Sequence, residues 1–276
     1  MPLHEIALLT AVSVGAVVLA TAVGIGVYLF GSFFLMRAHT SPREFPLSLR
    51  EFAREAFLAS LTQPLLPLYY MLGRKLAGGS GVPIVMVHGY MHNRVGFVGL
   101  ARALGRRGLG PIYGINYPWF VSVESNALRL ERFVARICEE TGQPKVDLVC
   151  HSMGGLVAIE MMRDEAKQAD LKVRKVVTIA TPHAGVAWKG PIFGIGAGDL
   201  RAGSKLLLAQ AQSKLVVPVL SIYSTHDNIV HPAAVAQLAL RGGRDIEVEG
   251  PAHLSILFSK AVADHVATFL AEPNPV

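Results

Sequence analysis

The chain has 276 residues, two cysteines, a formal net charge of +6 and a charged fraction of 17%. Two cysteines do not make a disulfide framework, and the basic residues are spread along the chain without a nucleic-acid-binding motif, so the composition argues against both of these protein classes. The low charged fraction comes mostly from an apolar amino terminus.

Residues 6–36 contain no charged side chain. A helix of this length measures roughly 46 Å, against about 30 Å of bilayer hydrocarbon, so we predict an uncleaved single-pass transmembrane anchor over residues 1–36. A cleaved signal peptide is the alternative, but the basic start is missing and the apolar run is too long. Arg37 and three further arginines follow the segment, and no Lys or Arg precedes it. This asymmetry favours a cytoplasmic catalytic domain, although a long downstream domain can override it.

Residues 37–81 are predicted to form a helical juxtamembrane linker. The sequence SLRE at 48–51 has the pattern of a capping box that opens a helix. This helix either lies on the membrane surface or packs against the catalytic core. The sequence GGSG at 78–81 then predicts a flexible joint.

Strand-like and helix-like segments alternate from residue 82 onward, as an α/β sheet requires. Strand patterns cover residues 83–90, 110–117, 145–150, 173–180, 216–224 and 244–250, and helical patterns cover residues 95–104, 122–140 and 153–167 and a final amphipathic segment. We therefore predict an α/β fold with a mostly parallel sheet flanked by helices, in one catalytic domain over residues 82–276.

The most informative segment is VDLVCHSMGG at residues 146–155. An apolar strand stops at Ser152 and a helical pattern begins at Met153, which is typical of a nucleophile elbow that exposes one hydroxyl. The turn requires small residues two positions before and after the serine. Gly154 meets this requirement, whereas Cys150 stands where glycine is usual.

A serine nucleophile needs a base, and the base needs an orienting acid. Asp227 and His253 each follow a predicted strand, where open α/β sheets bind their ligands. Asp227 has an alternative interpretation as a turn residue. His226, His231 and His265 compete with His253, but two of them flank Asp227 and the third falls on the final helix. We therefore predict Asp227 as the acid and His253 as the base.

The sequence VHGY at 87–90 ends another apolar strand. Acyl transfer builds negative charge on a carbonyl oxygen, which two backbone N–H groups must face. We predict that Met153 supplies one N–H group and Tyr90 the other, with Met91 behind it. An ordinary strand end is the alternative interpretation of the His-Gly pair.

These motifs resemble, in the same order, those of the α/β-hydrolase superfamily, and within it the lipase and esterase branch that includes bacterial triacylglycerol lipases. The resemblance covers residues 82–272 and is carried by VHGY, CHSMGG, TPHAG at 181–185, YSTHDNIVHP at 223–232 and PAH at 251–253. It implies that Ser152, Asp227 and His253 are nucleophile, acid and base, and that Tyr90 and Met153 form the oxyanion hole. The paired acidic loop that binds calcium in some lipases is not evident, so we predict no metal and no cofactor.

Residues 183–214 interrupt the alternating pattern with glycines among large apolar residues such as Trp188, Phe193 and Ile195. We predict a small lid or acyl-binding wall, and a plain surface insertion is the alternative. The whole chain is thus predicted to be a membrane-anchored serine hydrolase that cleaves lipid or other apolar carboxylic esters. An acyltransferase with the same triad and a non-catalytic membrane-tethered scaffold are the alternatives. The expected partners are an apolar ester and membrane lipid, without nucleic acid, and the sequence leaves the oligomeric state open.

Overall fold

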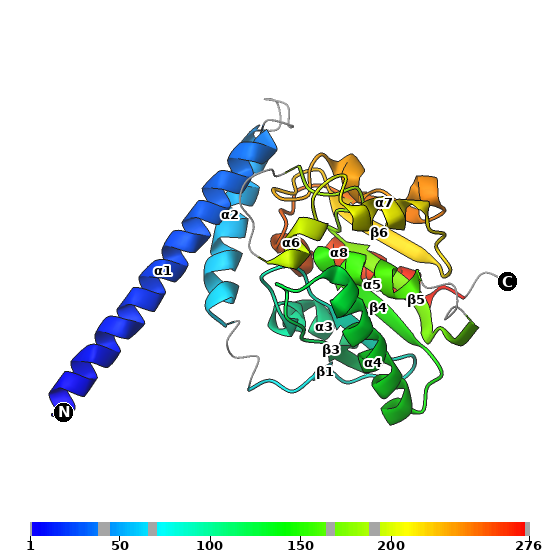
Figure 1. Cartoon of the computed structure of the whole chain (residues 1–276), viewed down its shortest axis with the longest axis horizontal. Helices are drawn as coiled ribbons and strands as arrows, with labels where there is room; N and C mark the ends of the chain where they lie inside the picture. Colours follow the sequence, from blue (N-terminus) through cyan, green and yellow to red (C-terminus); the bar gives the residue numbers. More distant parts are fainter. Residues whose placement is uncertain (1, 38–44, 66–70, 164–168, 188–193, 274–276) are drawn as a thin grey trace.

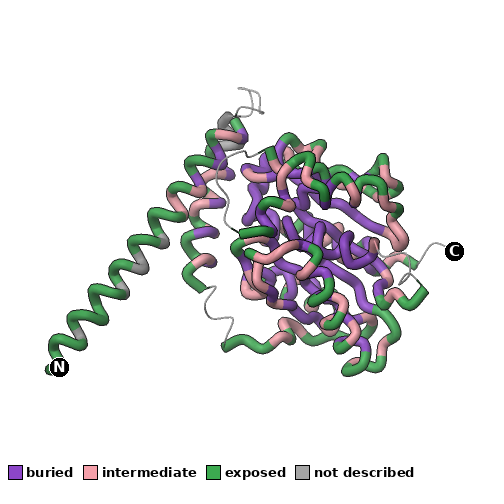
Figure 2. The backbone as a smooth tube through the Cα atoms, viewed as in Figure 1, coloured by how far each residue is buried: buried purple, intermediate pink, exposed green. Residues whose placement is uncertain are grey.

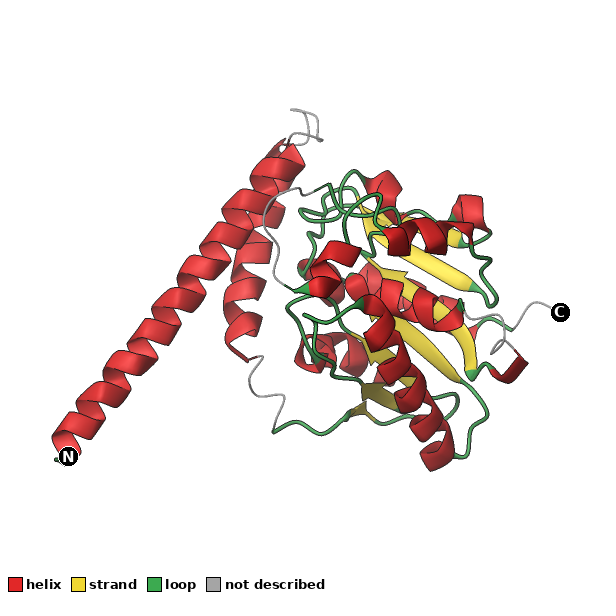
Figure 3. Ribbon diagram, viewed as in Figure 1, coloured by secondary structure: helices red, strands yellow, loops and turns green. Residues whose placement is uncertain are grey.

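The computed structural model describes residues 2–37, 45–65, 71–163, 169–187 and 194–273. An α/β body lies beside a pair of helices, α1 (Leu3–Arg37) and α2 (Phe45–Thr62), as Figure 1 shows. Helices cover both faces of the central sheet (Figure 3). The predicted fold class, a mostly parallel sheet flanked by helices, is confirmed for the α/β body.

The strands form one sheet, in the spatial order β1-β3-β2-β4-β5-β6-β7 across the described part of the chain. They are β1 (Lys75–Ala77), β2 (Ile84–Val87), β3 (Ile112–Gly114), β4 (Val146–His151), β5 (Val173–Ile179), β6 (Val219–Ser224) and β7 (Arg244–Val248). Neighbouring strands are parallel, except that β1 runs antiparallel to β3. The sequence did not predict β1, because three half-exposed residues give no alternation to read.

The helices of the body are α3 (Val98–Gly105), α4 (Val123–Thr141), α5 (Met153–Met162), α6 (Ile195–Asp199), α7 (Lys205–Gln212) and α8 (Lys260–Ala271). Short 3-10 turns are η3 (Arg94–Phe97), η5 (Ala233–Ala236), η6 (Ala239–Arg241) and η7 (Ser255–Phe258). The Ser122 side chain caps α4 by accepting the Ser125 N–H at 3.2 Å, and Gly142 ends the helix at a φ of 66°. Such local signals explain why the predicted helices are found within a few residues of their expected ends.

Two large apolar clusters, one on each face of the sheet, form most of the core. Alternate residues of β4 serve both, because Leu148 packs with α4 and α5 while Val149 packs with α3 and α8. Figure 2 shows this buried layer running through the sheet. Strands buried on both faces need no polar alternation, which is why β4 is read from the sequence as a continuous apolar run.

Two local expectations differ from the structure. Helix α2 begins at Phe45, three residues before the position at which the capping box was expected to open it. Pro46 stands in the first turn, where proline suits a helix start. The expected strand at 110–117 shortens to β3. In the GGSG segment a Cβ at Gly79 would lie 2.4 Å from the Leu109 carbonyl oxygen, whereas one at Gly78 would have no atom within 4 Å and all four residues are exposed, so the flexible joint stays a prediction. For the helix expected at 153–167, residues 164–168 lie outside the described residues.

Helices α1 and α2 pack against each other and against the body. The Phe52 ring lies 5.5 Å from Phe30 and 5.0 Å from Phe33, measured between ring centroids. Leu29, Phe33 and Met36 form a buried cluster with Ala252 of the body. The described side chains before residue 25 are exposed, as the outer part of α1 in Figure 2 shows. Phe52 and Ala56 of α2 pack against this cluster, so the structure shows the second alternative for the linker helix, packing against the α/β body.

Within the described residues, no helix is both long enough and apolar enough to span a membrane. The structure does not describe the side chains of six residues in α1. Part of the anchor predicted over residues 1–36 therefore lies outside the described residues. The six residues are Leu3, Ala7, Val14, Val17, Val18 and Thr21.

Candidate active site

Ser152 stands between β4 and α5 in a conformation that few non-glycine residues adopt. Its φ is 53° and its ψ is −127°. The Ser152 N–H donates to the Ile179 carbonyl at 2.9 Å, and the Ser152 carbonyl accepts the Thr181 hydroxyl at 2.9 Å. These hydrogen bonds to neighbouring β5 and the turn after it hold the strained turn in place.

The small residues around Ser152 are required by close backbone approach. A Cβ at Gly154 would lie 2.2 Å from the Val87 carbonyl oxygen, and one at Gly155 would lie 2.2 Å from the Thr181 hydroxyl oxygen. A Cβ at Gly89 would lie 2.7 Å from the Ser152 Cβ. The turn after β2 and the turn after β4 are therefore pressed together at the carboxyl edge of the sheet.

Cys150 is the position at which this elbow departs from the usual glycine. It is fully buried in β4, where it pairs with Val87 of β2 and Thr178 of β5 and joins the core cluster that contains Tyr117. Burial raises the pKa of the Cys150 thiol, so the group is a neutral core side chain and not a second nucleophile.

The structure brings together the three residues predicted to be nucleophile, acid and base. The Ser152 hydroxyl lies 3.1 Å from His253 Nε2, and His253 Nδ1 lies 3.0 and 2.9 Å from the two Asp227 carboxylate oxygens. Asp227 also accepts the backbone N–H groups of Ile229 and Val230, each at 2.8 Å. With Nδ1–H donating to Asp227, Nε2 is left to accept the serine proton.

The surroundings of His253 favour its protonated form. Burial lowers the pKa of His253, whereas the charge and hydrogen bond of Asp227, with a further contribution from Glu55, raise it, and the net result is a raised pKa. An imidazole shifted in this way is a stronger base toward the serine hydroxyl.

The competing histidines take other places. His226 is buried and accepts the Gly250 N–H at Nδ1 over 3.2 Å, so it supports the loop that leads to His253. His231 is buried in the loop after Asp227, and His265 is half-buried on α8. Among the described residues, His253 is the histidine whose ring contacts the Ser152 hydroxyl.

Met153 and Tyr90, the predicted oxyanion residues, lie on the two turns that meet at Ser152. Met153 is the first residue of α5, so its N–H is at the positive end of the helix dipole. Tyr90 directly follows Gly89, where an added Cβ would lie 2.7 Å from the Ser152 Cβ. Both backbone positions therefore adjoin the nucleophile.

His88 holds the turn after β2 in shape. Burial lowers the pKa of His88 to about 4, so the ring is neutral. Its Nδ1 lies 2.9 Å from the Gly89 carbonyl, and its Nε2 accepts the Tyr117 N–H at 3.2 Å. The ring also stacks on Tyr117 with a centroid distance of 4.0 Å.

The sequence analysis missed the groups that hold the loop bearing His253. The His253 N–H donates to the Asn228 side-chain oxygen at 2.9 Å, and His151 Nε2 donates to the His253 carbonyl at 2.9 Å. Asn228 follows Asp227 and His151 precedes Ser152 in the chain. Their positions next to the predicted site residues could have identified them as supporting residues from the sequence. The third group, Glu55, is 199 residues from Leu254 and gave no local signal.

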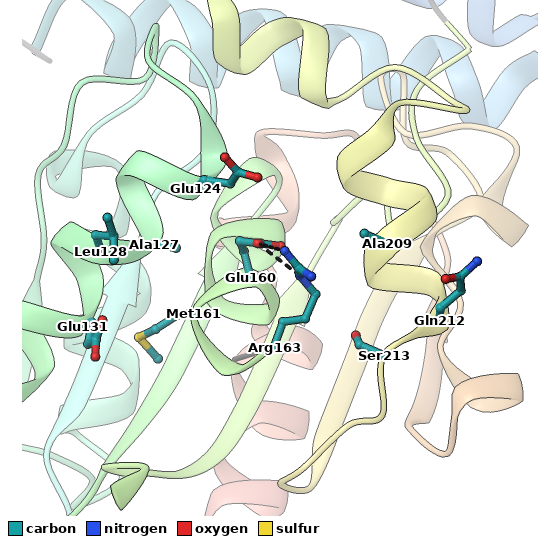
Figure 4. A pocket seen from close by; sticks show the side chains of 10 residues that line it. All are labelled: Glu124, Ala127, Leu128, Glu131, Glu160, Met161, Arg163, Ala209, Gln212 and Ser213. Atoms are coloured by element: carbon teal, nitrogen blue, oxygen red, sulfur yellow. Dashed lines mark hydrogen bonds and ion pairs between the residues drawn. The ribbon is translucent and has the colours of Figure 1, made fainter. Parts of the chain in front are cut away.

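A cleft of about 640 Å³ lies away from these residues, between α4, α5 and α7 (Figure 4). Its walls include the Glu160–Arg163 ion pair, with an N–O distance of 2.6 Å, and two further glutamates, Glu124 and Glu131. None of the three residues joined at Ser152 lines it. In the described part of the chain, no three His, Cys, Asp or Glu side chains gather as metal ligands would.

The model of the alpha/beta hydrolase family matches residues 84–214. Aspergillus fumigatus lipase B is similar in structure, with a TM-score of 0.61 and 15% identity over 70% of this chain, although this chain spans only 53% of that lipase. Bacillus licheniformis lipase BlEst2 in its mature form has a TM-score of 0.59 and 17% identity. The match covers 70% of this chain and 93% of that lipase. Paleococcus ferrophilus monoacylglycerol lipase has a TM-score of 0.50 and 19% identity, and the match covers 69% of this chain and 95% of that lipase. At these identities the likeness shows a shared fold.

Proposed function

We propose that this chain is a serine hydrolase that cleaves carboxylic esters, in keeping with the match of residues 84–214 to the alpha/beta hydrolase family and with the fold that it shares with lipases. The observation that carries the proposal is the continuous hydrogen-bonded series from the Ser152 hydroxyl through His253 to Asp227. A serine held at a strained turn and joined to a buried acid-base pair is built for acyl transfer.

In the proposed reaction, the Ser152 oxygen attacks the ester carbonyl while His253 Nε2 takes the hydroxyl proton. Asp227 stabilises the imidazolium that forms, and the N–H groups of Met153 and Tyr90 donate to the oxyanion. Collapse of the tetrahedral intermediate breaks the bond to the alcohol oxygen, which receives the proton from His253. Water then attacks the acyl-serine with His253 again as base, and the acid leaves as Ser152 recovers its proton.

We propose an apolar acyl group because aromatic side chains adjoin the oxyanion turn. Tyr90 packs edge-on against Trp119 with a centroid distance of 4.9 Å. The described part of the 183–214 insertion rests on the same segment, since the Ile195 N–H donates to the Phe120 carbonyl at 2.9 Å. Ile195 and Phe120 remain 71% and 53% exposed. This apolar rim is consistent with the expected lid or acyl-binding wall.

We also propose that the chain is held at a membrane by the first part of α1, with lipid as a partner. The proposal rests on the uncharged sequence of residues 6–36 and on exposed apolar side chains such as Leu8, Leu19 and Val12. The arginines after α1 favour a cytoplasmic catalytic body. Leu19→Arg is expected to move the protein out of the alkali-resistant membrane fraction, and Leu208→Arg, a similarly exposed leucine on α7, is the control.

The test of the activity combines labelling and hydrolysis. Wild-type protein is expected to react with a fluorophosphonate and to hydrolyse a series of p-nitrophenyl esters, and Ser152→Ala is expected to lose both, with kcat lower by about 10⁴-fold or more. Unchanged hydrolysis by Ser152→Ala would exclude the mechanism. Absence of labelling in folded wild type would favour the scaffold alternative. Transfer to an added alcohol in preference to water would identify an acyltransferase.

A further inference from the structure

The loop that carries His253 is held from outside the α/β body by one carboxylate. Glu55 of α2 is fully buried. One of its oxygens accepts the Leu254 N–H and the other accepts the Ser255 N–H, each at 2.7 Å. The Tyr28 hydroxyl of α1 donates to the same carboxylate at 3.1 Å. A single side chain thus fixes the two peptide groups that directly follow the histidine.

The geometry of this contact suits an ionised carboxylate. Two N–H donors, one to each oxygen, make short charge-assisted hydrogen bonds that restrict both the position and the tilt of the backbone. Because the His253 side chain projects from this backbone, the restriction reaches the ring that lies between Ser152 and Asp227. An amide at position 55 accepts through only one atom and turns an N–H group toward a backbone donor.

A second contact joins the helical pair to the loop that carries the acid. The Asn228 side-chain nitrogen donates to the Ser32 hydroxyl of α1 at 2.6 Å, and the Asn228 oxygen accepts the His253 N–H at 2.9 Å. The acid loop and the base loop therefore share supports from α1 and α2, although neither helix carries a residue of the triad.

We propose that Glu55 is a positioning residue, whose carboxylate holds residues 253–255 so that His253 meets Ser152 and Asp227, and that α1 and α2 are thereby part of the frame of the active site. This inference rests on the proposed serine hydrolase activity and assigns to the helical pair a role in catalysis besides membrane attachment.

The charge of Glu55 also affects the pKa of His253, which gives the proposal a second measurable consequence. Burial raises the pKa of Glu55, while the N–H groups of Leu254 and Ser255 and the charge of His253 lower it. Five groups interact with the His253 ring: Asp227, Ser152, His151 at a ring distance of 4.8 Å, the more distant His92, and Glu55. Of these, Asp227 and Glu55 are the anions, so loss of the Glu55 charge destabilises the imidazolium and lowers the pKa of His253.

The experiment is Glu55→Gln in the full chain, assayed with a p-nitrophenyl ester and a fluorophosphonate. We expect kcat and the labelling rate to fall about 10-fold or more with little change in KM, because a small misplacement of the base slows proton transfer. The base must be neutral to act, so the acidic limb of the kcat/KM profile is expected to move to lower pH.

Glu51→Gln is the matched control. Glu51 lies one turn earlier on α2, is also buried, with 3% of its surface exposed against 0% for Glu55, and has its carboxylate 3.6 Å from Arg54. We expect wild-type kcat and pH profile from this variant. Tyr28→Phe, which removes one hydrogen bond to Glu55, is expected to lower kcat by about 3-fold and keeps the proposal testable if Glu55→Gln does not fold.

The outcomes separate this inference from the proposed activity. If the wild type is neither labelled nor active, the serine hydrolase proposal fails. If the wild type is active and Glu55→Gln matches it in kcat and pH profile, the positioning role is overturned. A fall in kcat with an unmoved acidic limb would also overturn it, because a purely structural defect has that signature.

Discussion

The sheet edge around Ser152 and the amino-terminal helix α1 contrast in how tightly the fold constrains their glycines. A Cβ at Gly154 or Gly155 would overlap a neighbouring oxygen at 2.2 Å, whereas Gly15, Gly24 and Gly26 of α1 have no atom within 4 Å. At the sheet edge, only glycine fits at positions 154 and 155, because neighbouring atoms lie too close for a Cβ. Within the described structure, no such contact requires glycine at positions 15, 24 and 26 of α1. The contrast shows that a motif can be recognised in a sequence where close backbone contacts restrict a position to glycine.

The strongest test of the sheet edge is Asp227→Asn. An asparagine cannot balance the imidazolium charge, and its amide favours the wrong tautomer of His253, so we expect kcat to fall by about 10⁴-fold while the protein still folds. Stopped assays with a chromogenic ester measure the effect. Asp264→Asn is the control, because Asp264 is a half-exposed aspartate on α8 paired with Lys260 and Arg107. Equal activity of the two variants would remove Asp227 from the mechanism.

The glycine contrast itself is tested by Gly154→Ala beside Gly24→Ala. The first forces a methyl group onto the Val87 carbonyl, so we expect a loss of about 3 kcal/mol of stability or more. The second adds a better helix former in open space and is expected to leave stability unchanged or to raise it by up to about 1 kcal/mol. Denaturant unfolding measures both. Similar unfolding midpoints for the two variants would contradict the contrast.

A further expected effect is acid destabilisation of the α/β body. Burial lowers the pKa of His88 to about 4 and the pKa values of His92 and His183 to about 3 each. The unfolded chain binds protons below about pH 6.5, so the stability these groups confer is complete above that pH and is lost as the pH falls toward 3–4. His253, with its raised pKa, acts in the opposite direction. Calorimetry at pH 7.5 and 4.5 should show a lower Tm at pH 4.5, and an unchanged Tm would count against neutral buried histidines.

The sequence by itself determined the class of fold and the three residues that meet at the candidate site. Strand β4 is buried on both faces and has an apolar sequence, and Ser152 follows it directly. Asp227 and His253 lie in the loops a few residues after β6 and β7. In a parallel sheet these ends share one edge, so the proximity of residues 101 positions apart follows from topology alone. Gly154 was identifiable for the same local reason.

Only the tertiary structure decided how the site is supported. Glu55 and Ser32 belong to helices whose place against the body depends on long-range packing, such as that of Phe33 and Met36 with Ala252. No periodicity, cap or spacing encodes a hydrogen bond between residues 199 positions apart. The conformation of a turn depends on residues that are adjacent in the sequence. A contact between distant segments forms only when the whole chain has folded and both segments are in place.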